Sequence, residues 1–287
     1  MALLFCAQKI YKNVLVVHVR HDMRPACESQ KDVDLVTNYC RENCLELAIL
    51  EANLRDAEGL AASEDAYRQA RYQQISNLCE QKDFMYAATA HHADDQIETL
   101  LMKICRGTGI RGLQGIAESV DKGATTFVRP MLSITKDAVY DICKQKSISY
   151  IEDYTNCDTD IVRNAVRHKI LPQLKELYPK CAENAQNLTR IATSAHMLVQ
   201  AEVCTLANYE ERIGKIRVEA LALAQDVVVY EWLRYSLLAK HSTFMLDKLN
   251  STVVSSIVDA IRSRNVRAFK LQDGIQIRVN KSFVEIV

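Results

Sequence analysis

The sequence predicts an α/β protein in which a parallel sheet carries helices on both faces, followed by a small, mainly helical domain with a C-terminal β-hairpin. Three observations predict this fold class. In the first half of the chain, short apolar runs alternate with segments whose apolar residues recur at helical spacing. After Pro179 the pattern changes to long helical segments. The last stretch alternates in polarity around Asp273 and Gly274, a strong hairpin turn signal.

The expected elements follow in chain order. Strands are expected at 13–19, 45–50, 84–90, 125–128 and 149–151. Helices are expected between them at 28–44, 62–81, 93–105 and 135–146, the last with Thr135 as its N-cap. Because this alternation repeats, the strands should pair in parallel. The domain boundary is predicted near Pro179, which gives domains 1–179 and 180–287. The second domain is expected to hold helices at 182–211, 218–238 and 243–262 and a hairpin over 268–287.

Composition is typical of an intracellular globular protein. With 287 residues, 48% of them hydrophobic, the chain is long enough for a full α/β core and a smaller second domain. The ten cysteines include no Cys-x-x-Cys pair, and only Cys40 and Cys44 lie close together, so buried reduced thiols are expected. No segment has the length of a membrane span, and the start lacks the features of a signal peptide. A cytoplasmic protein is therefore expected.

The stretch 84–113 is the most informative part of the chain. An apolar run predicts a buried strand, two histidines follow at its carboxyl end, and helical periodicity then begins. In open α/β sheets, ligands bind beyond the carboxyl ends of the strands. On a helix, Asp94 and Asp95 lie four and three residues before Glu98, so one carboxylate pair can face a single cation. The alternative is that these acidic residues only complement the helix macrodipole.

Several motifs carry a family resemblance. The strings are His-His-Ala-Asp-Asp-Gln-Ile-Glu-Thr at 91–99 and Arg-Gly-Thr-Gly-Ile-Arg-Gly-Leu at 106–113, with further agreeing segments at 18–24, 66–72, 128–132, 151–156 and 163–168. Together they resemble the signature of tRNA(Ile)-lysidine synthetases, members of the N-type ATP pyrophosphatase (PP-loop) group, over residues 14–178. The resemblance implies an adenine nucleotide α-hydrolase-like fold. It also implies a ligase that adenylates the wobble cytidine of tRNA(Ile) with a CAU anticodon and joins it to free L-lysine, with ATP and Mg²⁺ as cofactors.

One motif of that family is not found in the chain. The family binds ATP phosphates with a Ser-Gly-Gly-x-Asp-Ser loop, whereas residues 1–58 contain no glycine. The first residues, Met1 to Leu4, resemble the start of the helix that follows this loop. We expect a protein truncated at its front rather than a degenerate relative, because the other motifs are intact.

The resemblance implies a role for each site residue. Arg71 and Arg163 are expected to hold ATP or the adenylated cytidine, and Asp95 and Glu98 to receive lysine, these four being the expected catalytic residues. His91 is expected to bind nucleotide or lysine, and Arg111 to reach the nucleotide or the tRNA. Asp94 is the expected magnesium ligand. The expected tRNA-binding residues are Arg167, His168 and Lys169.

The charge distribution leaves other functions open. The formal net charge is zero, so a tRNA would have to meet local basic stretches such as those near 163–190 and 262–281. The alternative for those stretches is a solvated helix face and a charged edge hairpin. A tRNA thiolase of the same group would use paired cysteines, which this chain does not offer. A catalytically inactive tRNA-binding module is the third hypothesis. A homodimer is also considered among the partners.

Overall fold

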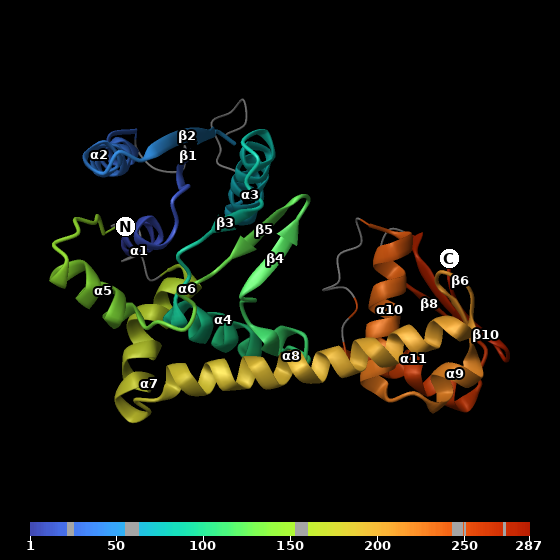
Figure 1. The fold of residues 1–287 in the computed structure, drawn as a ribbon. Helices are drawn as coiled ribbons and strands as arrows, with labels where there is room; N and C mark the ends of the chain where they lie inside the picture. The colour runs from blue at the N-terminus through green and yellow to red at the C-terminus, as the bar shows by residue number, and fades with distance from the viewer. Residues whose placement is uncertain (22–25, 55–62, 153–159, 243–248, 250, 272–273) are drawn as a thin grey trace. The chain divides into compact units, whose positions relative to one another are not determined.

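The computed structural model describes residues 1–287 except 22–25, 55–62, 153–159, 243–248, 250 and 272–273 (Figure 1). Contacts within the chain divide it into two compact units, Met1–Arg190 and Ile191–Val287. The boundary falls inside helix α8 (Cys181–Leu206). Among the described residues, no helix combines the length and the apolar character that crossing a membrane requires.

The strands of the first unit form two small sheets. In one, β1 (Leu15–His21) pairs in parallel with β2 (Glu46–Ala52). In the other, β3 (Tyr86–Ala88) pairs in parallel with β5 (Thr125–Val128), which also pairs with the antiparallel β4 (Ser119–Lys122). The predicted parallel pairing is confirmed, whereas β4 was not predicted. Its turn to β5 contains Gly123, whose φ of +61° favours glycine.

The helices of this unit mostly begin and end near the expected residues. They are α1 (Ala2–Ile10), α2 (Ala26–Glu42), α3 (Glu64–Gln81), α4 (Ala93–Cys105), α5 (Lys136–Gln145), α6 (Val162–Ala165) and α7 (Leu171–Leu177). The predicted N-cap Thr135 accepts a hydrogen bond from the Ala138 amide at 3.3 Å. Helix α3 packs against β2, β3 and β5, so it contacts both sheets. The strand expected at 149–151 is wrong, because these residues form no ladder with another strand.

The second unit contains a five-stranded antiparallel sheet and helices. The strand order is β6 (Glu210–Arg212), β7 (Lys215–Arg217), β10 (Phe283–Ile286), β9 (Gln276–Val279) and β8 (Arg267–Lys270). Beyond α8, its helices are α9 (Val218–Leu223), α10 (Asp226–Lys240) and α11 (Ser251–Ser263). The predicted hairpin is confirmed as the β8–β9 pair, although Asp273 in its turn lies outside the described residues.

Two helix predictions for this unit are wrong in extent. The helix expected at 182–211 ends at Leu206, because residues 210–212 pair with β7 through a turn at Gly214, whose φ is +75°. The helix expected at 218–238 is interrupted after Leu223, where Ala224 takes an extended ψ of 153°. The part of the third expected helix at 243–248 lies outside the described residues.

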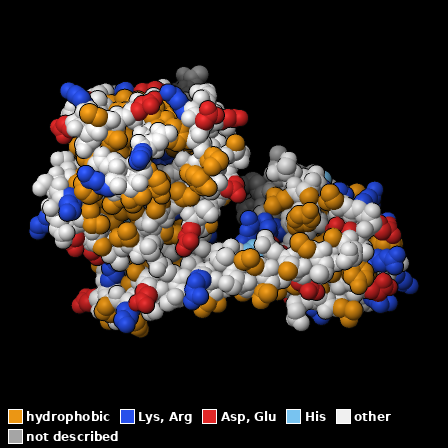
Figure 2. Space-filling model, in the orientation of Figure 1, with side chains coloured by type: hydrophobic (Ala, Val, Ile, Leu, Met, Phe, Trp, Pro, Cys, Tyr) orange, Lys and Arg blue, Asp and Glu red, His pale blue; other side chains and the backbone are white. Residues whose placement is uncertain are grey.

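The surface mixes charges of both signs. On the face of the first unit shown in Figure 2, Lys and Arg side chains are interspersed with Asp and Glu. This distribution agrees with the formal net charge of zero. The described cysteines are free. Their expected burial holds for Cys40, Cys79 and Cys143, whereas others are exposed, namely Cys27, Cys44, Cys105 and Cys204.

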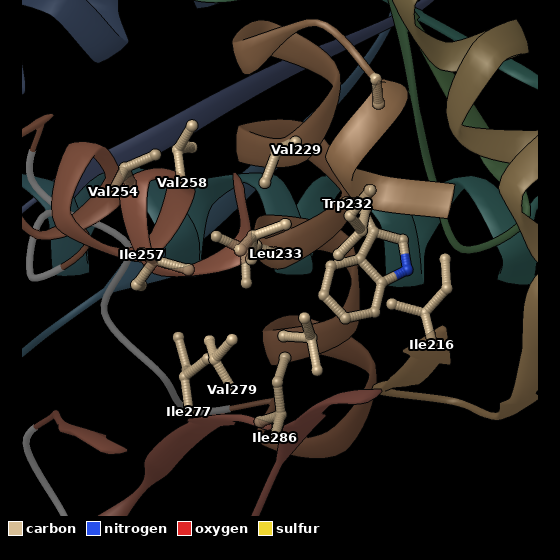
Figure 3. Close-up of a cluster of buried hydrophobic side chains, with 14 of the residues drawn as sticks. Ile216, Val229, Trp232, Leu233, Val254, Ile257, Val258, Ile277, Val279 and Ile286 are labelled. Atoms are coloured by element: carbon tan, nitrogen blue, oxygen red, sulfur yellow. The ribbon is translucent and has the colours of Figure 1, made fainter. Parts of the chain in front are cut away.

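The core of the second unit combines helix stripes with alternating strand residues (Figure 3). Every second residue of its central strands is buried, as at Ile277 and Val279 on β9, because side chains alternate between the faces of a strand. Helix α10 contributes Trp232 and Leu233, which are 1% and 0% exposed. The Trp232 indole donates a hydrogen bond to Glu210 at 2.7 Å, so its polar group is satisfied inside the apolar cluster.

Candidate functional site

Helix α4 begins directly beyond the carboxyl end of β3, and its first turn is fixed by a reciprocal cap. The His92 Nδ1 accepts from the Asp95 amide at 3.3 Å, and the Asp95 Oδ2 accepts from the His92 amide at 3.0 Å. Two amides at the helix start are thereby satisfied. The cap holds the remaining oxygen of Asp95, Oδ1, in a defined place.

A cavity of about 420 Å³ opens at this helix start. It lies where β1 and β3 end, the edge at which parallel sheets bind ligands. Its walls come from β1, α3, the segment after β3 and α4. The lining residues are Val17, His18, Val19, His21, Arg71, Tyr72, Ile75, Ala88, Thr89, Ala90, His91 and Asp95. The structure therefore brings together three predicted site residues, Arg71, His91 and Asp95, around one cavity.

Behind Asp95 lies a group of two carboxylates and two guanidiniums, which we call the ion-pair cluster: Asp95, Glu98, Arg163 and Arg167. Glu98 accepts from Arg163 Nε at 2.9 Å and from Arg167 Nε and Nη2 at 2.6 and 2.9 Å. Asp95 Oδ1 accepts from Nη2 of both arginines at 3.3 Å. The arginines reach α4 from α6 and from the π-helical turn at Val166–Ile170. The cluster therefore joins segments that are 65 or more residues apart.

Burial makes Glu98 the centre of this cluster. Glu98 is 0% exposed, and the Arg167 side chain is 18% exposed. Burial alone lowers the pKa of Arg167, but its hydrogen bonds to Glu98 and the charges of Glu98 and Asp95 outweigh it, so the pKa is raised. With two charges of each sign, the cluster is neutral. The carboxylate of Glu98, predicted to receive lysine, is therefore already bound by two guanidiniums.

Asp94 has contacts that do not suit its predicted role as a magnesium ligand. Its Oδ2 is 2.5 Å from Lys175 Nζ, and its Oδ1 accepts from the Lys136 amide at 3.2 Å. An adjacent ammonium repels a divalent cation, and the ion needs further oxygen ligands. Within the described ranges, no group of three or more His, Cys, Asp or Glu side chains is placed to hold a metal. The residues at Asp94 therefore do not fit Mg²⁺.

His91 is a neutral side chain at the wall of the cavity. Its Nδ1 lies 3.0 Å from Thr89 Oγ1. Burial lowers its pKa most, Asp95 opposes this, and nearby arginines lower it further, to about 4. At neutral pH the imidazole is uncharged, so it can hydrogen-bond a ligand without adding charge.

The remaining predicted residues lie away from the cavity lining. Arg111 is exposed just before the short 3₁₀ turn Gly112–Gln114. His168 and Lys169 are exposed on the π-helical turn, whereas Arg167, predicted with them to bind tRNA, belongs to the ion-pair cluster. Because His168 and Lys169 are exposed, a tRNA could reach both side chains, and their contact with tRNA stays a prediction.

Three cavity residues with titratable side chains were not among the predicted site residues. His18 and His21 lie on β1, and Tyr72 follows Arg71 on α3. The sequence could have indicated the two histidines, because they lie near the carboxyl end of the strand predicted at 13–19, and His91 likewise follows the strand predicted at 84–90. The position of Tyr72 depends on how α3 packs against the second sheet, where its ring meets Phe127 edge-on at 4.7 Å.

Comparison with known proteins adds independent findings. Residues 1–174 match a family model described as the PP-loop domain. The chain is 34% identical over 190 residues to the tRNA(Ile)-lysidine synthase of Lactiplantibacillus plantarum, covering 65% of this chain and 42% of that protein. It is 34% identical over 191 residues to the enzyme of the same name from Bacillus subtilis, covering 66% and 40%. A third, from Polaromonas naphthalenivorans, is 28% identical over 242 residues, covering 84% and 72%.

The matches cover less than half the length of the first two relatives. Among solved structures, the chain resembles the U34-tRNA thiolase NcsA from Methanococcus maripaludis, a structure with a [4Fe-4S] cluster. The TM-score is 0.56 at 15% identity, and the match covers 67% of this chain and 68% of that one. At this identity the likeness concerns the fold alone.

Proposed function

Because the chain belongs to the PP-loop family, we propose that it acts as a tRNA(Ile)-lysidine synthase. In this reaction ATP activates the C2 carbonyl of the wobble cytidine as an adenylate. The ε-amine of free lysine then forms the C–N bond as AMP leaves, and the anticodon reads AUA instead of AUG. The observation that carries the proposal is the shared cavity of Asp95, Arg71 and His91, which provides an anionic group beside a cationic one.

Asp95 is the group we propose to bind an ammonium of lysine. Its Oδ2 is used in the helix cap, so the lysine must approach Oδ1, where the two guanidiniums already lie at 3.3 Å. Arg163 is the guanidinium that yields, because its side chain is 32% exposed against 18% for Arg167. Once released, Arg163 can turn its charge to a phosphate of ATP or of the adenylate. Lysine then replaces one cation by another, and the cluster stays neutral.

Glu98 has a different role in this proposal. Its buried carboxylate anchors Arg167 and, before lysine binds, Arg163, so it is a positioning residue and not a ligand of lysine. The amine must lose a proton before it attacks, and Asp95 is the acceptor nearest to its proposed position. Arg71 and His91 also line this cavity, and we propose that they contact the nucleotide. We propose no step that depends on a magnesium ion at Asp94.

Lysine transfer to tRNA tests the proposal. The protein is incubated with ATP, labelled lysine and a tRNA(Ile) carrying the CAU anticodon, and label in the tRNA and release of AMP are measured. Asp95→Asn should lower lysine incorporation by about 30- to 160-fold, since a hydrogen bond to a charged group contributes about 2–3 kcal/mol. The exposed carboxylate of Asp141 on α5 provides the control Asp141→Asn, which should keep wild-type incorporation.

Other outcomes would favour the alternatives. Equal lysine incorporation by Asp95→Asn and the wild-type protein would refute the assigned lysine site. Sulfur in the tRNA and no lysine would identify a thiolase, although the described cysteines form no cluster that could hold iron and sulfur. Tight tRNA binding without any consumption of ATP would identify an inactive binding module.

A further inference from the structure

Beside the cavity lies a buried guanidinium, that of Arg129, for which the described residues supply no counter-ion. Arg129 directly follows β5 at its carboxyl end and is 7% exposed. Its Nη1 donates to the Ala117 carbonyl at 2.6 Å and its Nη2 to the Tyr72 hydroxyl at 3.5 Å. Its buried Nε has no hydrogen-bond partner, and no carboxylate of the described chain pairs with it. An unpaired buried charge is costly, so a compensating anion is expected from outside the chain.

Two further guanidiniums surround the same tyrosine. Arg68 and Arg71 lie one turn apart on α3, each with Cζ 5.8 Å from the centre of the Tyr72 ring. Tyr72 and Arg71 also line the cavity, whereas Arg68 is exposed at its side. No ion pair joins Arg68 or Arg129 to any carboxylate that the structure describes. The Lys122 Nζ lies nearer, 4.7 Å from the centre of the same ring, so four cationic groups meet around Tyr72.

The neighbouring titratable groups respond to this excess of positive charge. Burial raises the pKa of the Tyr72 phenol, but the hydrogen bond from Arg129 and the charges of the three arginines outweigh it, so the pKa is lowered. Arg129 and Arg68 also contribute to lowering the pKa of His91, although burial is the largest cause of that shift. Both shifts agree with a wall that favours an anionic ligand.

We propose that Arg68, Arg71 and Arg129, with the Tyr72 hydroxyl, form a binding site for a phosphate group beside the cavity that Arg71, Tyr72 and Asp95 line. Guanidiniums match phosphate in charge and in hydrogen-bond geometry, and a phosphate offers more charge and more acceptor oxygens than a carboxylate does. This inference rests on the proposed function for its two possible sources of phosphate, ATP and the tRNA backbone next to the target cytidine. The site adds Arg68, Arg129 and Tyr72 to the residues that hold substrate.

The probe for this site is inorganic phosphate. Its affinity is measured from the rise in melting temperature with phosphate concentration, at constant ionic strength maintained with chloride. Arg68→Ala is the main variant, because an exposed side chain is removed without disturbing the core. Tyr72→Phe is the second, because it removes only the hydroxyl. The matched control is Arg41→Ala, an exposed arginine on α2 that is hydrogen-bonded to Asn38.

We expect phosphate to bind the wild-type protein and Arg41→Ala equally, and Arg68→Ala and Tyr72→Phe at least about tenfold more weakly, which corresponds to about 1.4 kcal/mol. Phosphate should also raise the pKa of the Tyr72 phenol. That pKa is followed by the absorbance change on ionisation, and the change due to Tyr72 is the one that Tyr72→Phe loses. Equal phosphate affinity for all four proteins would overturn the proposal. This titration needs no catalytic turnover, so its result stands apart from the lysine assay.

Steady-state kinetics distinguish the two sources. If the site holds a phosphate of ATP, Arg68→Ala raises the KM for ATP and leaves the KM for tRNA unchanged. If it holds a phosphodiester of the tRNA, the KM for tRNA rises instead. Unchanged KM values for both substrates, together with unchanged phosphate affinity, would show that Arg129 only braces the backbone at Ala117.

Discussion

Removal of the charge of Glu98 should destabilise the first unit strongly. Glu98→Gln keeps the shape of the side chain but leaves the partly buried guanidiniums of Arg167 and Arg163 with Asp95 as their carboxylate partner in the ion-pair cluster. Breaking a buried ion pair costs about 3–5 kcal/mol. Because the Arg163 side chain is 32% exposed and both arginines keep their contact with Asp95, we expect the lower end, about 3 kcal/mol.

Urea denaturation measures this loss of stability with two probes that report on different units of the protein. The single tryptophan, Trp232, lies in the second unit, so its fluorescence follows that unit, while circular dichroism follows the helices of both. Glu98→Gln should shift the part of the dichroism transition that belongs to the first unit to lower urea. The fluorescence transition should stay unchanged.

A surface pair supplies the matched control for Glu98→Gln. Glu46 lies 2.9 Å from Lys82, but both side chains are at least half exposed. Glu46→Gln should therefore change the free energy of unfolding by less than about 1 kcal/mol. If Glu98→Gln costs no more than Glu46→Gln, the reasoning that burial makes the ion-pair cluster stabilising is refuted.

Three further predictions follow from the site and the core. Arg163→Ala should raise the affinity for lysine in the absence of ATP by about tenfold, or about 1.4 kcal/mol, because lysine then has no Arg163 guanidinium to displace from Asp95. Calorimetric titration measures this affinity, and equal or weaker lysine binding by the variant would contradict the prediction. The wild-type protein should lose about 1–2 kcal/mol of stability as the pH falls from 6.5 to 4, because His91 is protonated at a higher pH in the unfolded chain than in the folded protein. The variant His91→Gln should not show this loss. Melting curves across this range test it, and parallel losses in both proteins would exclude His91 as the cause. Leu233→Ala should lower the free energy of unfolding of the second unit by about 3 kcal/mol, since the side chain is 0% exposed, and an unchanged Trp232 transition would contradict the packing of this core.

Local patterns predicted the elements that depend on local interactions. The bounds of α4 and the cap at Thr135 agree with the sequence prediction, because periodicity and capping involve residues within one or two turns. The prediction failed at 149–151, where an apolar run has no partner strand. It also missed β6, β7 and β4, which are short and exist through pairing with other strands.

The features of the candidate site also differ in whether local sequence could predict them. The sequence by itself determined that Asp95 and Glu98 lie one helical turn apart beyond the end of a strand, because helix geometry sets that spacing. Only the tertiary structure decided that Glu98 pairs with Arg163 and Arg167, that Asp94 pairs with Lys175, and that Arg129 is buried with no carboxylate partner in the part of the chain that the structure describes. The physical reason is that a charge can pair with any opposite charge that the chain path brings within reach, and sequence separation does not specify that path.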